Sequence, residues 1–355
     1  MGDIYVSGFL ATDHLPAAAR GGPADDPGAG AGRSGAGRSG VGRAHGKAIL
    51  LGEHAVVYGV PALAVGIDRG AHARAAPRTP GPSRLLVHGW NITVYEDQLE
   101  HDLARAFRAL LEAARAHSPS LEAQDVEVDA SLPPGGGLGC SAAIGVAIAR
   151  ALCPHAGHDA IQALAMGWER VFHGNPSGVD AAVAARGGCV LFRRGDPIEP
   201  VRVRGPLQLC IGNTGRASST KAMVEGVARL RDGQQDVVDR SFEAVGALVQ
   251  SARLALEAGD RIALGRLMDR NQTLLGGLSL STPEIETMCG LARDAGALGA
   301  KLTGAGGGGC VVALVPTQVV ADAVLEAWKG EGLEGFSTTA AQELRPRALE
   351  NETAP

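Results

Sequence analysis

The sequence lacks any uninterrupted run of about 18 apolar residues, which is the length that a membrane-spanning helix requires. Its N-terminus also lacks the basic start and the apolar stretch of a secretory signal peptide. These absences argue against a membrane protein and against an exported one. We therefore expect a soluble protein of the cytoplasm that has no membrane partner.

CxxC pairs are also missing, although the chain contains six cysteines. Most of these cysteines lie in apolar stretches, as reduced thiols of a cytoplasmic protein do. The pattern therefore argues against a structural zinc site.

The sequence also has no excess of basic residues. The 33 Lys and Arg residues are outnumbered by 38 Asp and Glu residues, and the net charge is -5. This balance argues against nucleic acid or an acidic membrane surface as the main partner. It still permits an anionic small-molecule substrate wherever basic groups gather locally.

Residues 1–43 have the composition of a disordered leader. From residue 17 onward they are mostly Gly, Ala, Pro, Asp and Arg, and AGRSG occurs twice, at 31–35 and 36–40. Such a segment buries too little apolar surface to offset the entropy lost on ordering. A basic tail that binds nucleic acid is the alternative, but the four arginines of this segment stand without aromatic residues.

The remaining sequence alternates between strand-like and helical segments, and its length of 355 residues favours two lobes with a ligand site between them. We expect strands at 47–51, 61–67, 125–131, 187–194, 207–212 and 310–315. Helices are expected at 96–117, 141–152, 159–172, 219–231, 236–257, 260–275 and 284–295. The mixture predicts the α+β or α/β class.

The segment PPGGGLGCSAA, Pro133 to Ala143, is the strongest chemical signal. It places glycines between an expected strand and the N-terminus of a helix, where unpaired N–H groups and a partial positive charge attract anions. Glycines also allow a phosphate chain to approach the backbone closely. The loop is neither a Walker loop, because no Lys follows its last glycine, nor a GxGxxG turn.

A second glycine run, Gly304 to Gly309, has the letters of GxGxxG, but its apolar strand follows the run instead of preceding it. A dinucleotide-binding turn requires the reverse order. The run is either a tight turn that leads into a strand or a second clamp for phosphate or substrate. Its pairing with the first loop favours the clamp.

Four side chains outside the glycine runs are candidates for chemistry. Ser141 stands at a helix start, where its hydroxyl would reach a magnesium ion on a nucleotide or merely cap the helix. Glu169 lies near the end of an expected helix and Asp180 follows eleven residues later, as the last residue of HGNPSGVD, so one carboxylate would bind metal while the other handles a proton. Lys47 begins an expected strand, although an isolated lysine there is usually only solvated.

Four blocks in order resemble the GHMP kinase family: GKAILLGEHAVVYG, LPPGGGLGCSAA, HGNPSGVDAAV and KLTGAGGGGC. The resemblance covers residues 44–340, and EHAVVYG together with ERVFHGNPSGVD is more specific than either glycine loop. It implies an α+β fold of two lobes, the first like ribosomal protein S5 domain 2 and the second ferredoxin-like. The implied organisation is a leader at 1–43, an N-terminal domain at 44–215, a C-terminal domain at 216–345 and a flexible tail at 346–355.

The resemblance also implies ATP-dependent phosphorylation of a small alcohol, with mevalonate and its 5-hydroxyl as the expected substrate. Asp180 would be the catalytic base, Lys47 would pair with it, and Ser141 and Glu169 would hold Mg2+. Substrate contacts are expected from Glu53, His54, Asp180, Thr214 and Gly306. ATP contacts are expected from Pro134, Gly135, Gly136, Gly137, Leu138, Gly139, Cys140, Ser141, Ala142, Gly306 and Gly307.

One position departs from the family pattern, because Cys140 stands where the family usually has Ser in GLGSSAA. The second Ser is retained as Ser141, so we expect activity. The alternatives are another GHMP kinase acting on phosphomevalonate, a sugar or homoserine, a related ATP-using decarboxylase, or a non-catalytic binding protein on the same scaffold. The resemblance further implies a homodimer.

Overall fold

The structure is a computed structural model that describes residues 39–133, 136–174 and 176–341. Eleven strands form one connected sheet in this part of the chain. They are β1 (Gly40–Leu51), β2 (Ala62–Pro77), β3 (Arg84–Val87), β4 (Ile92–Tyr95), β5 (Gln124–Ala130), β6 (Cys189–Phe192), β7 (Glu199–Val201), β8 (Leu207–Asn213), β9 (Gly299–Thr303), β10 (Cys310–Val315) and β11 (Glu334–Ala340).

Nine α-helices accompany the sheet in the described residues. They are α1 (Asp102–His117), α2 (Cys140–Leu152), α3 (His158–His173), α4 (Val179–Arg186), α5 (Thr220–Gly233), α6 (Gln235–Ala258), α7 (Arg261–Gly277), α8 (Pro283–Asp294) and α9 (Gln318–Gly330). Two short 3-10 helices, η2 (Ala55–Tyr58) and η3 (His88–Trp90), complete the description. None of the described helices is both long enough and apolar enough to cross a membrane.

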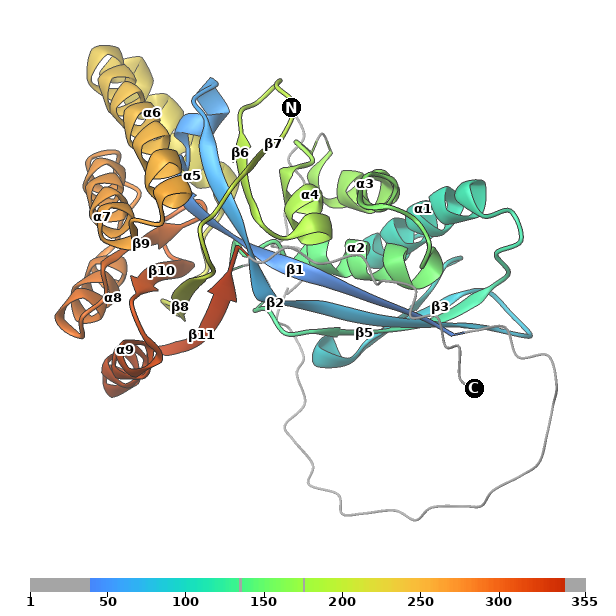
Figure 1. Cartoon of the computed structure of the whole chain (residues 1–355). Coiled ribbons are helices and arrows are strands. Elements are labelled where there is room, and N and C mark those ends of the chain that lie inside the picture. Colours follow the sequence, from blue (N-terminus) through green and yellow to red (C-terminus); the bar gives the residue numbers. More distant parts are fainter. Residues whose placement is uncertain (1–38, 134–135, 175, 342–355) are drawn as a thin grey trace.

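Two lobes share the sheet. The first contains the order β4-β3-β5-β2, with β1 and β6 also paired to β2 and β7 paired to β6, and the second contains β11-β8-β10-β9. The two parts meet where Ala340 of β11 pairs with Ile67 of β2. Figure 1 shows α1 to α4 along one side of β1, β2 and β5, with α6 to α9 grouped at the other end of the molecule. The expected α+β class is confirmed.

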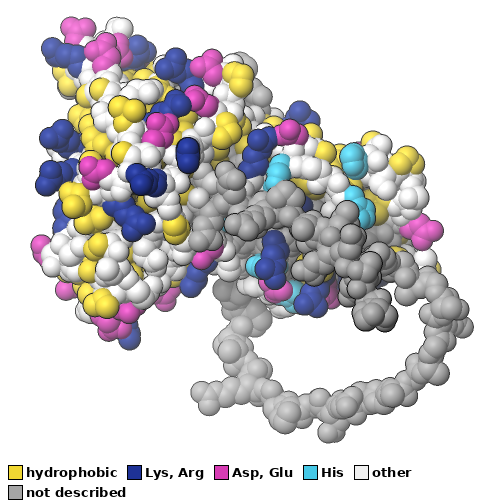
Figure 2. Space-filling view, in the orientation of Figure 1, with side chains coloured by type: hydrophobic (Ala, Val, Ile, Leu, Met, Phe, Trp, Pro, Cys, Tyr) yellow, Lys and Arg dark blue, Asp and Glu magenta, His cyan; other side chains and the backbone are white. Residues whose placement is uncertain are grey.

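The last strand in the described residues, β11, links the two lobes. β11 pairs with β8 along its whole length, and β8 also pairs with β10. Hydrogen bonding therefore joins β8 to the strands of the second lobe, and the division expected at residue 215 stays a prediction. Figure 2 shows acidic and basic side chains interspersed over the helices of this lobe, so the visible face carries both signs of charge side by side.

Most expected elements are present with small changes of length. Helix α1 buries Leu103, Phe107, Leu110 and Leu111 as its apolar stripe requires, but the helix begins at Asp102 instead of residue 96. Leu99, which lies within the helix expected at 96–117, precedes the observed helix and is 43% exposed. The cause is a turn, since the N–H groups of Gln98 and His101 donate to the carbonyls of Tyr95 and Gln98.

The leader boundary at residue 43 was placed too late, because β1 begins at Gly40. Residues 40 to 43 pair with residues 75 to 72 of β2. The two glycines there serve close packing and not flexibility: a Cβ at Gly40 would collide with Ala151 O, and one at Gly42 with Ala147 O, both on α2.

This packing predicts a measurable loss of stability for Gly42→Ala. The added methyl group forces the β1 and α2 backbones apart, which we expect to lower the free energy of unfolding by about 1–3 kcal/mol. Chemical denaturation of the whole chain measures the change. Gly290→Ala is the matched control, because Gly290 lies within α8 with open space around its Cα, and alanine there is expected to be neutral or slightly stabilising. Equal stability of the Gly42 variant and wild type would contradict the packing argument.

Candidate active site

The first glycine loop joins β5 to α2, in the expected order of strand, loop and helix. Gly139 is the N-cap of α2 with φ 71°, and the Lys47 N–H donates to Leu138 O at 2.8 Å, which ties the loop to β1. The first N–H groups of a helix have no partner within it, so those at Cys140, Ser141 and Ala142 point to an anion site. Pro134 and Gly135 lie outside the described residues.

Lys47 and Asp180 form an ion pair at this helix tip. Lys47 Nζ lies 3.1 Å from Asp180 Oδ1. Lys47 belongs to β1 and is only 8% exposed, whereas Asp180 lies in the first turn of α4. Both the ammonium group and the positive end of α4 stabilise the carboxylate. A Cβ at Gly139 would lie 3.3 Å from Lys47 Cβ, so the loop packs directly on this lysine.

Ser141 and Glu169 form a second pair beside the first. Ser141 Oγ donates to Glu169 Oε1 at 2.9 Å, and the Trp168 indole N–H donates to Ser141 O at 3.0 Å. Glu169 is only 3% exposed, and burial together with the nearby negative charge of Asp180 raises its pKa to about 8, against the opposing effects of Ser141 and Lys47. The four predicted residues Lys47, Ser141, Glu169 and Asp180 therefore share one electrostatic environment.

The second glycine loop lies against the first. A Cβ at Gly137 would be 3.7 Å from Gly304 Cα, and every glycine from Gly304 to Gly309 has a positive φ. Gly306 and Gly307 pack on the second lobe: Ser218 Oγ donates to Gly306 O, and Gly307 N donates to Leu280 O at 2.8 Å. The N–H group of Gly307 is therefore already engaged within the protein.

The three remaining candidates surround this second loop. His54 Nε2 donates to Ala305 O at 2.7 Å, and Thr214 Oγ1 donates to Gly309 O at 2.9 Å. Burial lowers the pKa of His54. Glu53 is 1% exposed, and both its carboxylate oxygens are engaged, one by Lys301 Nζ and the other by Asn271 Nδ2 at 3.2 Å. Both oxygens of Glu53 are therefore satisfied within the protein, and its expected contact with substrate stays a prediction.

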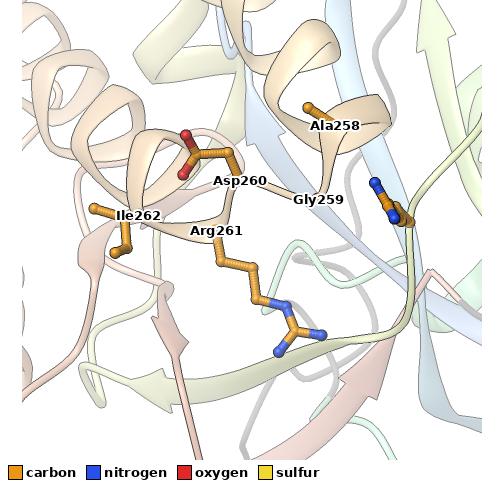
Figure 3. Close-up of a pocket in the computed structure, with 6 residues that line it drawn as sticks. Ala258, Gly259, Asp260, Arg261 and Ile262 are labelled. Atoms are coloured by element: carbon orange, nitrogen blue, oxygen red, sulfur yellow. The ribbon is translucent and has the colours of Figure 1, made fainter.

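A hollow of about 470 Å³ lies elsewhere, where α6 turns into α7. Figure 3 shows Arg261 reaching from the start of α7 along this hollow. Arg261 Nη2 donates to Pro206 O at 3.0 Å, and Asp260 caps α7 by accepting from Ala263 N. Neither glycine loop lines this hollow, and neither does the Lys47–Asp180 pair or the Ser141–Glu169 pair. The size of the hollow therefore does not mark it as the reaction site.

Two family models match the chain, "GHMP kinases N terminal domain" over residues 102–188 and "GHMP kinases C terminal" over residues 230–333. A curated mevalonate kinase of Pyrococcus horikoshii is 35% identical over 292 residues, covering 76% of this chain and 87% of that protein. This chain belongs to the GHMP kinase family. A second relative, the mevalonate kinase of Aeropyrum pernix, is 34% identical over 84% of this chain and 95% of that protein.

Solved structures agree with the fold of this kinase. The crystal structure of L. major mevalonate kinase in complex with R-mevalonate superposes with a TM-score of 0.73 at 29% identity, covering 86% of this chain and 96% of that one. The Methanococcus jannaschii mevalonate kinase has a TM-score of 0.74 at 22% identity, which supports the fold. The two-lobe GHMP kinase fold implied by the sequence is confirmed.

Cys140, the position that departs from the family pattern, keeps a polar contact in this kinase. Its Sγ donates to Leu132 O at 3.8 Å, and burial raises the pKa of the thiol to about 12. The thiol is therefore neutral at physiological pH and is able to donate this hydrogen bond.

The residues that sequence reasoning missed are those that support the site. Trp168 orients Ser141, Lys301 pairs with Glu53, and Thr303 bonds to the β1 backbone. Lys301 and Thr303 belong to the KLTGAGGGGC block that resembles the family, and this membership is the one sequence feature that could have indicated their role.

Proposed function

We propose that this kinase transfers the γ-phosphoryl group of ATP to the 5-hydroxyl of mevalonate and releases 5-phosphomevalonate and ADP. The ion pair between Lys47 and Asp180, placed beside the N-terminus of α2, is the observation that carries the proposal. The identity of more than a third with a curated mevalonate kinase supports mevalonate as the alcohol. So does the likeness to a structure that holds R-mevalonate.

Asp180 would act as the general base. An alcohol is a weak nucleophile at neutral pH, so the carboxylate accepts its proton as the oxygen forms a bond to the γ-phosphorus. The bond between the γ-phosphorus and the bridging oxygen breaks, and ADP leaves with that electron pair. Lys47 holds Asp180 in place and offsets the negative charge that develops on the alcohol oxygen.

The residues at the helix tip fit a magnesium ion. Ser141 and Glu169 offer oxygen donors, the ligand type that Mg2+ prefers. Glu169 is deeply buried with its pKa raised to about 8, so a nearby cation is needed to stabilise its charged form at neutral pH. We propose that both residues hold Mg2+, which would neutralise charge on the ATP phosphates. The described ranges hold no group of three His, Cys, Asp or Glu that could bind a metal by itself, at the helix tip or elsewhere, so the phosphates of ATP would supply further ligands.

The alcohol is tested by a panel of acceptors, namely mevalonate, phosphomevalonate, galactose and homoserine, each with ATP and Mg2+. We expect ADP release above the acceptor-free rate with mevalonate, and mass spectrometry should place one phosphoryl group on the product. Turnover with only a sugar, homoserine or phosphomevalonate would overturn the proposed substrate. No turnover with any acceptor would favour the non-catalytic alternative.

Three further expectations stay predictions. They are a homodimer, residence in the cytoplasm, and the organisation into domains at 44–215 and 216–345. Light scattering of the purified chain measures the first of these directly.

A further inference from the structure

A fully buried ion pair joins the two lobes. Lys301 of β9 and Glu53, which follows β1, have side chains with 0% exposure. Lys301 Nζ donates to Glu53 Oε1 and to Leu302 O, and Asn271 of α7 donates to Glu53 Oε2 at 3.2 Å. The carbonyl oxygen of the Asn271 side chain is buried without a hydrogen-bond partner.

Stability alone is a weak reason for such a pair. Burial raises the pKa of Glu53 and lowers that of Lys301, and the charge of each partner opposes the effect on the other. An apolar pair of similar volume is often as stable as a buried ion pair or more so. In some proteins, however, buried polar or ionic groups specify which elements meet and in what register.

The pair is one of three successive contacts between residues 49–54 and residues 301–305, which we call the seam. Ile49 N donates to Thr303 Oγ1 at 3.0 Å, and that hydroxyl donates back to Ile49 O at 3.2 Å. His54 Nε2 contacts Ala305 O at 2.7 Å. His54 has φ 58°, a conformation that non-glycine residues rarely adopt, so the seam holds the turn after β1 in an unfavourable backbone geometry.

The seam connects the two halves of the reaction site. On its first side, Lys47 precedes Ile49 in the same strand and carries the ion pair to Asp180. On its second side, Thr303 leads directly into the glycine loop that begins at Gly304 and contacts Gly137. A shift along the seam would therefore change the distance between the proposed base and the loops beside the phosphates.

We infer that Lys301 is a positioning residue: acting through Glu53, it holds the Lys47 end of β1 against the second glycine loop in the geometry that phosphoryl transfer requires. This inference rests on the proposed function of the same site. Misalignment of reacting groups by about 1 Å can lower a rate by about 100-fold. We expect the loss on kcat and little change in the KM values for ATP and alcohol, because the Lys301 side chain is fully buried and presents no surface to either substrate.

The test compares Glu53→Gln, Lys301→Met and the double variant that carries both changes. Each single change leaves one buried charge without its partner, and such a variant is strongly destabilised. The double variant removes both charges, so we expect its melting temperature to return close to that of wild type. Its kcat is nevertheless expected to stay about 10- to 100-fold below wild type, with both KM values within about threefold.

Arg115→Met is the matched control, because Arg115 forms a partly buried ion pair with Glu96 at 2.8 Å in the first lobe. We expect it to lower the melting temperature and to keep wild-type kinetic constants. A double variant with wild-type kcat would overturn the inference, and so would a control that loses kcat to the same extent. Wild-type turnover in the acceptor panel is measured first, so a failure of mevalonate as substrate is seen separately, and the variants are then compared on the alcohol that wild type uses.

Discussion

Replacing Asp180 by asparagine is expected to lower kcat by about 10²- to 10⁴-fold, the usual contribution of a positioned general base. Asparagine keeps the size of the side chain but accepts no proton at neutral pH. It also removes the charge that pairs with Lys47 at 3.1 Å. The rate of ADP formation at saturating ATP and alcohol measures the effect.

ATP binding should survive this substitution. The expected nucleotide contacts come from backbone amides at the start of α2 and not from the Asp180 side chain, so calorimetry should give a dissociation constant close to that of wild type. Asp159→Asn is the matched control, because Asp159 also lies in the first turn of a helix, but its side chain is 86% exposed. A near-normal kcat for the Asp180 variant would remove Asp180 from the base role. Lost nucleotide binding would point to structural damage instead.

The long helices and the first glycine loop were predictable from the sequence because their signals are local. The apolar spacing that predicts α1 comes from residues one turn apart, and α1 buries Leu103, Phe107, Leu110 and Leu111 among them. The order of strand, glycines and helix around Gly139 likewise predicts an anion site from neighbours in the chain. The roles of Lys47 and Asp180 came from the resemblance, since nothing local links two residues on separate elements.

Two of the missed elements, α4 and β11, carry little local signal, whereas the missed helix α9 buries Ala321, Val324 and Trp328 at helical spacing and was open to prediction. Helix α4 has eight residues and is apolar almost throughout, so it is too short to show a helical period. Strand β11 reads EGFSTTA, in which only Phe336 is strongly apolar, and it becomes a strand by pairing with β8 and β2. Its sequence carries little strand signal of its own.

The supporting residues of the site were hidden for a related reason. A lysine and a glutamate far apart in the chain are normally solvated, and only the folded structure brings Lys301 to Glu53. Gly40 and Gly42 led to a different error, because they were assigned to the disordered leader although they belong to β1. Their composition resembles a flexible segment, yet it is the contact with α2 that requires them.

In the absence of metal, Glu169 is expected to make the protein less stable as the pH rises from about 5 to about 8. Its pKa lies near 8 in the folded state against an ordinary value of 4.5, so between these limits the folded protein binds the proton more tightly than the unfolded chain. The stabilisation is complete below the lower value and is lost as the pH approaches the upper one. The slope contributed by this one group is at most about 1.4 kcal/mol per pH unit.

Glu169→Gln isolates this effect, because glutamine stays neutral throughout. Denaturation in EDTA between pH 5.5 and 8 should show that the stability of wild type falls with pH more steeply than that of the variant. Glu112→Gln is the control, because the Glu112 side chain is 59% exposed, and it should keep the steeper wild-type dependence on pH. Mg2+ with a non-hydrolysable ATP analogue should raise the stability of wild type mainly above pH 7, where the carboxylate needs a cation. We expect the variant to lose kcat by about 100-fold or more, as when one preorganised electrostatic group is removed. If the free energy of unfolding depends on pH equally in wild type and the variant, Glu169 is already charged at neutral pH without metal. Its burial would then require no cation.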